Sequence, residues 1–249
     1  MTGRTTEVEV PTAPAQSIDA CHPLSIEAHR GQAPGRWLWT VKWLLVVPHV
    51  VVLAVLWTVF AVLTVGAGVS ILVAGRYPRG LFDVNVGVLR WTWRVGHYGY
   101  LALGTDRYPP FTLRATDHPA SLDVAYPARL SRPLVLVKWL LVVPHLLIVE
   151  ILLGAVSRFG PTSPPVYTAG LLGVLVLVAG VCLTVLRRYP AGLFDLIVGL
   201  NRWVFRVVVY VALMTDVYPP FRLDQGGREP AAGPAATART PALVAGGAP

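Results

Sequence analysis

The chain contains the same text twice, and this duplication constrains its fold more than any other feature. Residues 76–83, Arg-Tyr-Pro-Arg-Gly-Leu-Phe-Asp, recur with one change at 188–195, an offset of 112. Two further matches relate 41–49 to 137–145 at an offset of 96, and 105–111 to 215–221 at an offset of 110. Three matches in the same order predict a tandem duplication of a unit of about a hundred residues.

Composition predicts that both copies lie in a membrane. Hydrophobic residues make up 54% of the 249 residues and charged residues only 14%, whereas a soluble domain is nearer one quarter charged. The net charge of +8 could indicate a protein that binds nucleic acid. However, the arginines flank apolar stretches, so the predicted partners are the lipid bilayer and its anionic phospholipid headgroups, and nucleic acid is not predicted.

The matches divide the chain into two membrane repeats between two tails. Residues 25–28 align with 121–124 at the offset of 96, so the unit begins near residue 24. The predicted parts are a disordered tail at 1–23, repeat 1 at 24–119, repeat 2 at 120–223 and a disordered tail at 224–249. Residues 1–36 contain no apolar segment typical of a signal peptide, so insertion is expected to depend on the spans themselves.

The long apolar stretch that opens each repeat is interpreted as a hairpin of two spans. Residues 37–75 are too long for one crossing of about 20 residues and barely enough for two. Repeat 2 has 16 more residues in this interval (112 − 96), including the polar, Pro-rich segment 157–165, and a hairpin tip accommodates such an insertion most easily. The predicted spans are therefore 37–56, 58–75, 134–156 and 166–186. For repeat 1 the alternative is one long helix kinked at Pro48.

A further helix in each repeat, predicted at 81–103 and 193–213, carries a polar stripe. Asp83, Arg90 and Arg94 share one helical face, and the spacing is the same at Asp195, Arg202 and Arg206. Two arginines within a span would be costly, so an interfacial amphipathic helix is preferred over a third span. The predicted lipid or anion contacts are Arg76, Asp83, Arg90, Arg94, Arg188, Asp195, Arg202 and Arg206. The alternative is simple anchoring, with Asp83 neutralising part of the charge of Arg90.

These elements together predict an all-α membrane protein with short β segments. Arginines are concentrated on one side of the predicted hairpins, which places the termini and the 106–132 linker in the cytoplasm. An even number of crossings per copy predicts parallel repeats related by an axis along the membrane normal. Alternating stretches at 111–113 and 122–124 predict a small cytoplasmic β element that pairs strands from both copies.

Five ionisable residues within the predicted spans are candidates for function: Lys42, His49, Lys138, His145 and Glu150. His49 and His145 could have a proton or ligand role. Alternatively, they could satisfy backbone carbonyls freed by the preceding proline, or satisfy each other across the repeat interface. Glu150 occurs only in repeat 2, and could act in ion movement or be a buried partner of His145 or Lys138. Neither a metal site nor a disulfide is predicted, because Cys21 and Cys182 lie in different kinds of segment.

The repeated strings resemble a bacterial membrane family catalogued as domain of unknown function 4389. The resemblance rests on residues 42–49, 76–91 and 105–111 and covers about 25–223. Repeat 2 departs from the pattern where Ile197 matches Asn85 and Val217 matches Arg107. The resemblance implies an integral membrane protein, often with the domain twice, and it implies no activity.

Three functions stay open at the level of sequence. The first is a non-enzymatic scaffold or accessory subunit that contacts anionic lipid and a membrane protein partner or a second copy. The second is a small transporter or channel with polar residues at the repeat interface. The third is an enzyme of lipid or cell-envelope chemistry, although the common nucleophile, phosphate-loop and metal motifs are absent and no cofactor is predicted.

Overall fold

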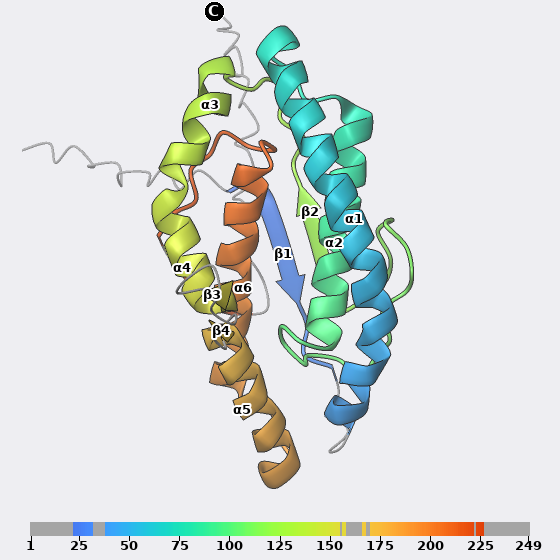
Figure 1. The fold of residues 1–249 in the computed structure, drawn as a ribbon. Coiled ribbons are helices and arrows are strands. Elements are labelled where there is room, and N and C mark those ends of the chain that lie inside the picture. The colour runs from blue at the N-terminus through green and yellow to red at the C-terminus, as the bar shows by residue number, and fades with distance from the viewer. Residues whose placement is uncertain are drawn as a thin grey trace, which may run out of the picture. The chain divides into compact units, whose positions relative to one another are not determined.

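The computed structural model describes residues 22–31, 38–154, 156–157, 166–167, 170–221 and 223–226 (Figure 1). The described part is mostly helical, as predicted. Its elements are β1 (Leu24–Ala28), α1 (Leu38–Ala74), α2 (Arg79–Tyr98), β2 (Ala120–Val124), α3 (Arg132–Leu141), α4 (Val143–Leu153), β3 (Val156–Ser157), β4 (Val166–Tyr167), α5 (Leu171–Leu186) and α6 (Ala191–Val211). The predicted tails lie almost wholly outside the described residues.

Helix α1 is uninterrupted, so the predicted hairpin of spans 37–56 and 58–75 is wrong. Its 37 residues continue through Pro48 and extend about 55 Å. Residues 55–59 contain no Gly, Pro, Asn or Asp, so no residue there favours a turn. The single-helix alternative is the one that the structure contains.

In repeat 2 the equivalent of α1 is divided into α3, α4 and α5. Leu186 ends α5 and is the counterpart of Ala74 at the end of α1, while a 50° bend separates α3 from α4 just before Pro144, the counterpart of Pro48. The insertion lies between α4 and α5, where β3 pairs with β4, and most of residues 155–169 fall outside the described ranges. By length and composition α1 could cross a membrane, and the bent α3–α4 pair could form a second span.

Strands β1 and β2 form an antiparallel pair that is centred on equivalent residues. Ile26 faces Leu122, its counterpart at the offset of 96. A local two-fold axis therefore passes between these residues and relates the two repeats. The predicted pairing of strands from both copies is confirmed, but the partner of β2 is 24–28 and not 111–113.

The long helices of the two repeats are antiparallel. Trp39, at the start of α1, donates a hydrogen bond from Nε1 to Thr184 Oγ1 near the end of α5, at 2.9 Å. Gly68, near the end of α1, packs against Val135 at the start of α3, and its counterpart Gly180 packs in the same way against Trp39. The two-fold axis is consequently perpendicular to α1. The predicted parallel arrangement, with the axis along the spanning helices, is wrong.

Helices α2 and α6 lie between the long helices and the strands. Helix α1 packs on α2, α4 and α5 pack on α6, and the strands pack on α2 and α6 (Figure 1). On α2, Trp91 and Val95 contact α1, whereas Arg90 and Arg94 point toward β2 and the loop that precedes it. Most residues of both helices are buried. These amphipathic helices exist as predicted, but they form the interior of the described fold.

Candidate functional site

The repeated strings meet in space, and each meeting begins with a buried lysine. Lys42 Nζ donates to Thr105 O at 2.7 Å and forms a 2.5 Å ion pair with Asp106. The lysine lies 5.1 Å from the centre of the Tyr98 ring. Side-chain exposure at Lys42 is 1%, so this cation is desolvated and depends on its partners.

We call this set of contacts, a buried lysine bound by a Thr carbonyl, an Asp carboxylate and a Tyr ring, the lysine clamp, and repeat 2 contains a second one. Lys138 Nζ donates to Thr215 O at 2.7 Å, pairs with Asp216 at 2.6 Å and lies 5.2 Å from the centre of the Tyr210 ring. The predicted lysine candidates are therefore fixed by the Thr-Asp pair of their own repeat. The carboxylate that binds Lys138 comes from Asp216, and Glu150 is exposed on α4.

About two turns further along each long helix, seven residues after the lysine, the histidine lies in an aromatic cage. His49 stacks on Phe111 at 4.0 Å between ring centres, contacts Tyr108, and accepts a 3.2 Å hydrogen bond at Nδ1 from Trp91 Nε1. Repeat 2 places the counterparts Trp203, Tyr218 and Phe221 around His145.

The two histidines differ in their polar partners. His145 Nε2 lies 3.0 Å from Pro219 O, and Tyr218 Oη lies 3.4 Å from Nδ1. His49 instead uses the indole of Trp91, so the predicted role in satisfying the carbonyl freed by Pro48 is not what this geometry provides. Each cage is built by the Tyr-Pro-Pro-Phe string of its own repeat, so the structure does not bring His49, His145 and Glu150 into one site.

The stripe arginines bind protein groups, and one pair of them crosses the two-fold axis. Arg90 of repeat 1 donates from Nε to Leu122 O at 2.9 Å and pairs with Asp123, both on the strand of repeat 2. Its counterpart Arg202 donates from Nη2 to Ile26 O at 2.9 Å, on the strand of repeat 1. The carboxylate paired with Arg90 is thus Asp123, and the predicted pairing with Asp83 is wrong.

The second stripe arginine of each repeat is buried against the loop after its helix. Arg94 donates to the carbonyls of Thr112 and Arg114 and to Thr116 Oγ1, and Arg206 forms a 2.6 Å ion pair with Asp224. Arg94, Arg202 and Arg206 are each at most 2% exposed. These three guanidinium groups therefore make their contacts within the protein in this structure. Lipid contact by the stripe stays a prediction.

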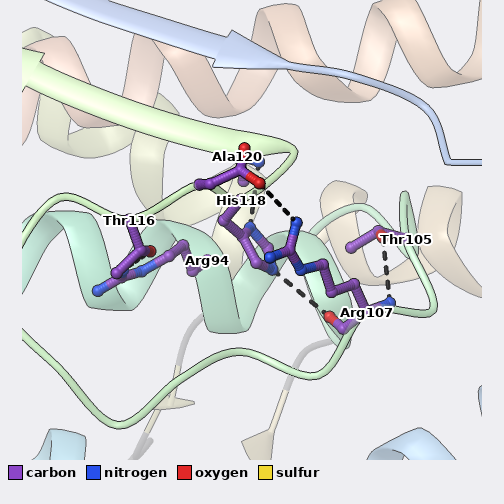
Figure 2. A network of polar contacts seen from close by, with 7 residues as sticks. Arg94, Thr105, Arg107, Thr116, His118 and Ala120 are labelled. Atoms are coloured by element: carbon purple, nitrogen blue, oxygen red, sulfur yellow. Dashed lines mark hydrogen bonds and ion pairs between the residues drawn. The ribbon is translucent and has the colours of Figure 1, made fainter.

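Figure 2 shows the polar network of repeat 1 around the 105–120 loop. Ala120 N donates to His118 Nδ1 at 3.1 Å, so His118 Nε2 carries the proton that points to Arg107 O at 3.4 Å. Burial lowers the pKa of His118, and the positive charges of Arg94 and Arg107 act in the same direction. The loop is thus held by a neutral imidazole at neutral pH.

The remaining predicted site residues lie nearer the surface. Arg76, Asp83 and Arg188 are exposed, and Asp195 is half-buried. In the part of the chain that the structure describes, no group of three or more His, Cys, Asp or Glu side chains could hold a metal ion.

Two features were missed by sequence reasoning. The first is His97, buried in α2 with Nε2 3.3 Å from His29 O, where burial lowers its pKa to about 3. The second is an apolar groove of about 540 Å³ between α1, α3–α4 and α6. No sequence signal distinguishes the residues of this groove from other apolar positions, because α1, which forms one wall, has apolar residues on both its buried and its exposed side.

A family model described as "Domain of unknown function (DUF4389)" matches residues 37–112 and 167–222, more than half of the chain. The chain belongs to the DUF4389 family. Its two DUF4389 regions fall one in each repeat, which confirms the duplication, and each contains a Thr-Asp-x-Tyr-Pro-Pro-Phe string. The second DUF4389 match begins at residue 167, in the inserted segment that separates residues 137–145 from the rest of repeat 2. No curated protein and no solved structure matches the chain.

Proposed function

We propose that this protein is a non-enzymatic membrane scaffold or accessory subunit. The long helices α1 and α3–α5 anchor it in lipid, and the side that carries β1 and β2 contacts anionic headgroups and partner proteins in the cytoplasm. The family assignment brings no activity, so the proposal rests on how the described residues distribute apolar and charged groups.

The observation that carries the proposal is the apolar outer face of α1. Its buried residues, from Lys42 to Ile71, follow one side of the helix, and the opposite side exposes apolar residues from end to end. The exposed set includes Val41, Leu44, Val47, Val51, Val55, Val62, Val65, Val69 and Val73. A surface of this kind far exceeds the apolar patches of soluble monomers and is suited to acyl chains.

Charged groups collect on the other side of α2. Asp117, Asp123 and Arg114 are exposed there, next to the strand and the loop that α2 binds. Exposed carboxylates and guanidinium groups require water or headgroups. This face is therefore the one we assign to the cytoplasm and to partners.

The internal chemistry supports a structural role over catalysis. Lys42 and Lys138 bind carboxylates, and the caged histidines bind aromatic or carbonyl partners. A catalytic base must reach a substrate proton, and a transport path needs polar groups along a shared cavity. The two cages are separate, which does not favour the transporter alternative.

Two measurements test the proposal. The protein should stay with the membrane pellet after an alkaline carbonate wash, and release into the supernatant would reject membrane anchoring. A photocrosslinking residue at Ser121 on β2 should capture a protein partner, whereas the same residue at Val62 on the outer face of α1 should not. Absence of a protein adduct at Ser121 in native membranes would reject the scaffold role.

A further inference from the structure

The apolar groove lies where the two repeats meet on the outer side of the long helices. Phe60, Ala61 and Val65 of α1 form one wall, Trp139 and Leu146 of α3 and α4 form the other, and Val208 of α6 lies in the floor. Its volume of about 540 Å³ falls in the range of small-molecule sites. Several wall residues, including Val65 and Trp139, are more than half exposed, so the groove opens to the surroundings of the outer face.

The chemistry of the walls restricts what can occupy the groove. Nearly every lining group is aliphatic or aromatic, and the hydroxyl of Thr64 already accepts a hydrogen bond from Asn85 at 3.3 Å. A polar ligand would lose its water without gaining partners, at a high cost. A hydrocarbon chain gives up no hydrogen bond to water when it enters.

One end of the groove is cationic. Leu72 and Val135 line this end. The adjacent residue Val73 accepts a 3.0 Å hydrogen bond at its carbonyl from Arg132 Nη2. Arg132 is exposed and has further N–H groups to offer, and the exposed Arg76 follows α1. The acidic group at this end, Asp216, is already bound by Ser131 N at 2.7 Å and Lys138 Nζ at 2.6 Å. The local field therefore favours an anion beside an apolar channel.

We propose that the groove holds one acyl chain of an anionic phospholipid whose phosphate lies at Arg132 and Arg76. This inference deepens the proposed function and rests on it, because it turns general lipid contact into one site between the repeats. The apolar groove matches the acyl chain of such a lipid, and the cationic end matches its phosphate. A zwitterionic lipid would fill the groove and present the same phosphate, but its ammonium group would add a positive charge beside the two arginines.

Native mass spectrometry of the detergent-purified full chain tests the site. With phosphatidylglycerol added, one lipid per chain should be retained, and phosphatidylcholine should be retained about fivefold less. Ala61→Trp, which fills the groove from an exposed position, should reduce retention at least about fivefold, whereas Val62→Trp, one residue away on the outer face, should not. If Ala61→Trp lowers the thermal midpoint, Val65→Trp on the next turn replaces it.

The cationic end has its own matched pair. Arg132→Gln should abolish the preference for phosphatidylglycerol, and Arg107→Gln, which removes an exposed arginine in repeat 1, should leave it unchanged. Equal retention of both lipids by the native chain would overturn the headgroup assignment. Lipid retention that Ala61→Trp does not change would overturn the assignment of the acyl chain to the groove. A dimer that carries no lipid would also overturn it, because a second copy would then cover the groove. A chain that resists carbonate yet retains no lipid rejects this inference alone, whereas release by carbonate rejects the proposed function as well.

Discussion

His97 and Gly104 pack against each other as a large and a small residue, and the order of sizes is reversed at the equivalent positions of repeat 2. A Cβ atom on Gly104 would lie 2.2 Å from His97 Cε1, so only glycine leaves room for the ring. The counterparts in repeat 2 are Val209 and Met214, and in both repeats the later residue donates its backbone N–H to the carbonyl of the earlier one. A small and a large side chain thus exchange places while the backbone geometry is kept.

This exchange predicts strong coupling between the two positions. Gly104→Met alone should destabilise by about 2 kcal/mol through overpacking, and His97→Val alone by about 2 kcal/mol through a cavity. The double variant should recover most of both losses, as measured by denaturation in detergent micelles. Additive losses would show that the two side chains do not share one space.

The same histidine makes stability depend on pH. His97 has a pKa of about 3 in the fold because burial disfavours its charge, against 6.5 when unfolded, so only the unfolded state takes up a proton between these values. Stability should therefore be full above pH 6.5 and fall by about 1.4 kcal/mol per unit as pH drops toward 3. The variant with His97→Val and Gly104→Met should show a shallower fall between pH 7.5 and 5.5. An identical pH profile would assign the dependence to other groups, His118 among them.

The buried lysine clamps should be far more costly to break than surface pairs. Lys42→Met leaves Thr105 O and Asp106 without their cation and should lower stability by about 3 kcal/mol. Arg107→Gln, which removes the exposed 3.4 Å pair with Asp117, should leave the thermal midpoint unchanged. Equal midpoints for both variants would mean that the Lys42 clamp is not a stabilising contact.

At the scale of elements, the sequence shows which segments repeat and does not show how they pair. The amphipathic α2 and α6 were predictable because their polar stripe recurs every three or four residues. Helix α1 was not predictable as one element, because its outer face is as apolar as its buried face and no periodic contrast remains. The insertion in repeat 2 suggested a hairpin tip, but in the structure it separates α4 from α5, which together with α3 correspond to the single helix α1 of repeat 1.

The register of β1 against β2 could not be predicted either. The offset of 96 shows that the two segments are equivalent, but it does not show which residues pair with which. The register can be tested with Cys21 and Cys182 replaced. Glu27→Cys with Ser121→Cys, which face each other, should cross-link on mild oxidation, and Ser25→Cys with Ser121→Cys, two residues out of register, should not. Mass spectrometry of the linked peptides provides the measurement. Efficient linkage of the second pair would contradict the observed register.

At the scale of the whole molecule, the charged side that carries β1 and β2 should face the cytoplasm. In a chain without Cys21 and Cys182, a cysteine at Ser121 should react with an impermeant maleimide only after the cells are opened, because the proposed function assigns this side, where Arg114 is exposed, to the cytoplasm. Labelling of Ser121 from outside would invert the orientation.

The contacts that cross the two-fold axis have a consequence for how such a protein could arise. Arg90 and Arg202 each bind the strand of the other repeat, and Trp93 meets its own counterpart Phe205 at 5.6 Å between ring centres. A chain with one repeat could make all these contacts with an identical copy, as an isologous homodimer that exchanges strands. Gene fusion would then make the encounter intramolecular and independent of concentration. Once fused, each half is free to diverge, and Glu150, His97 and the insertion are three such departures from the ancestral symmetry.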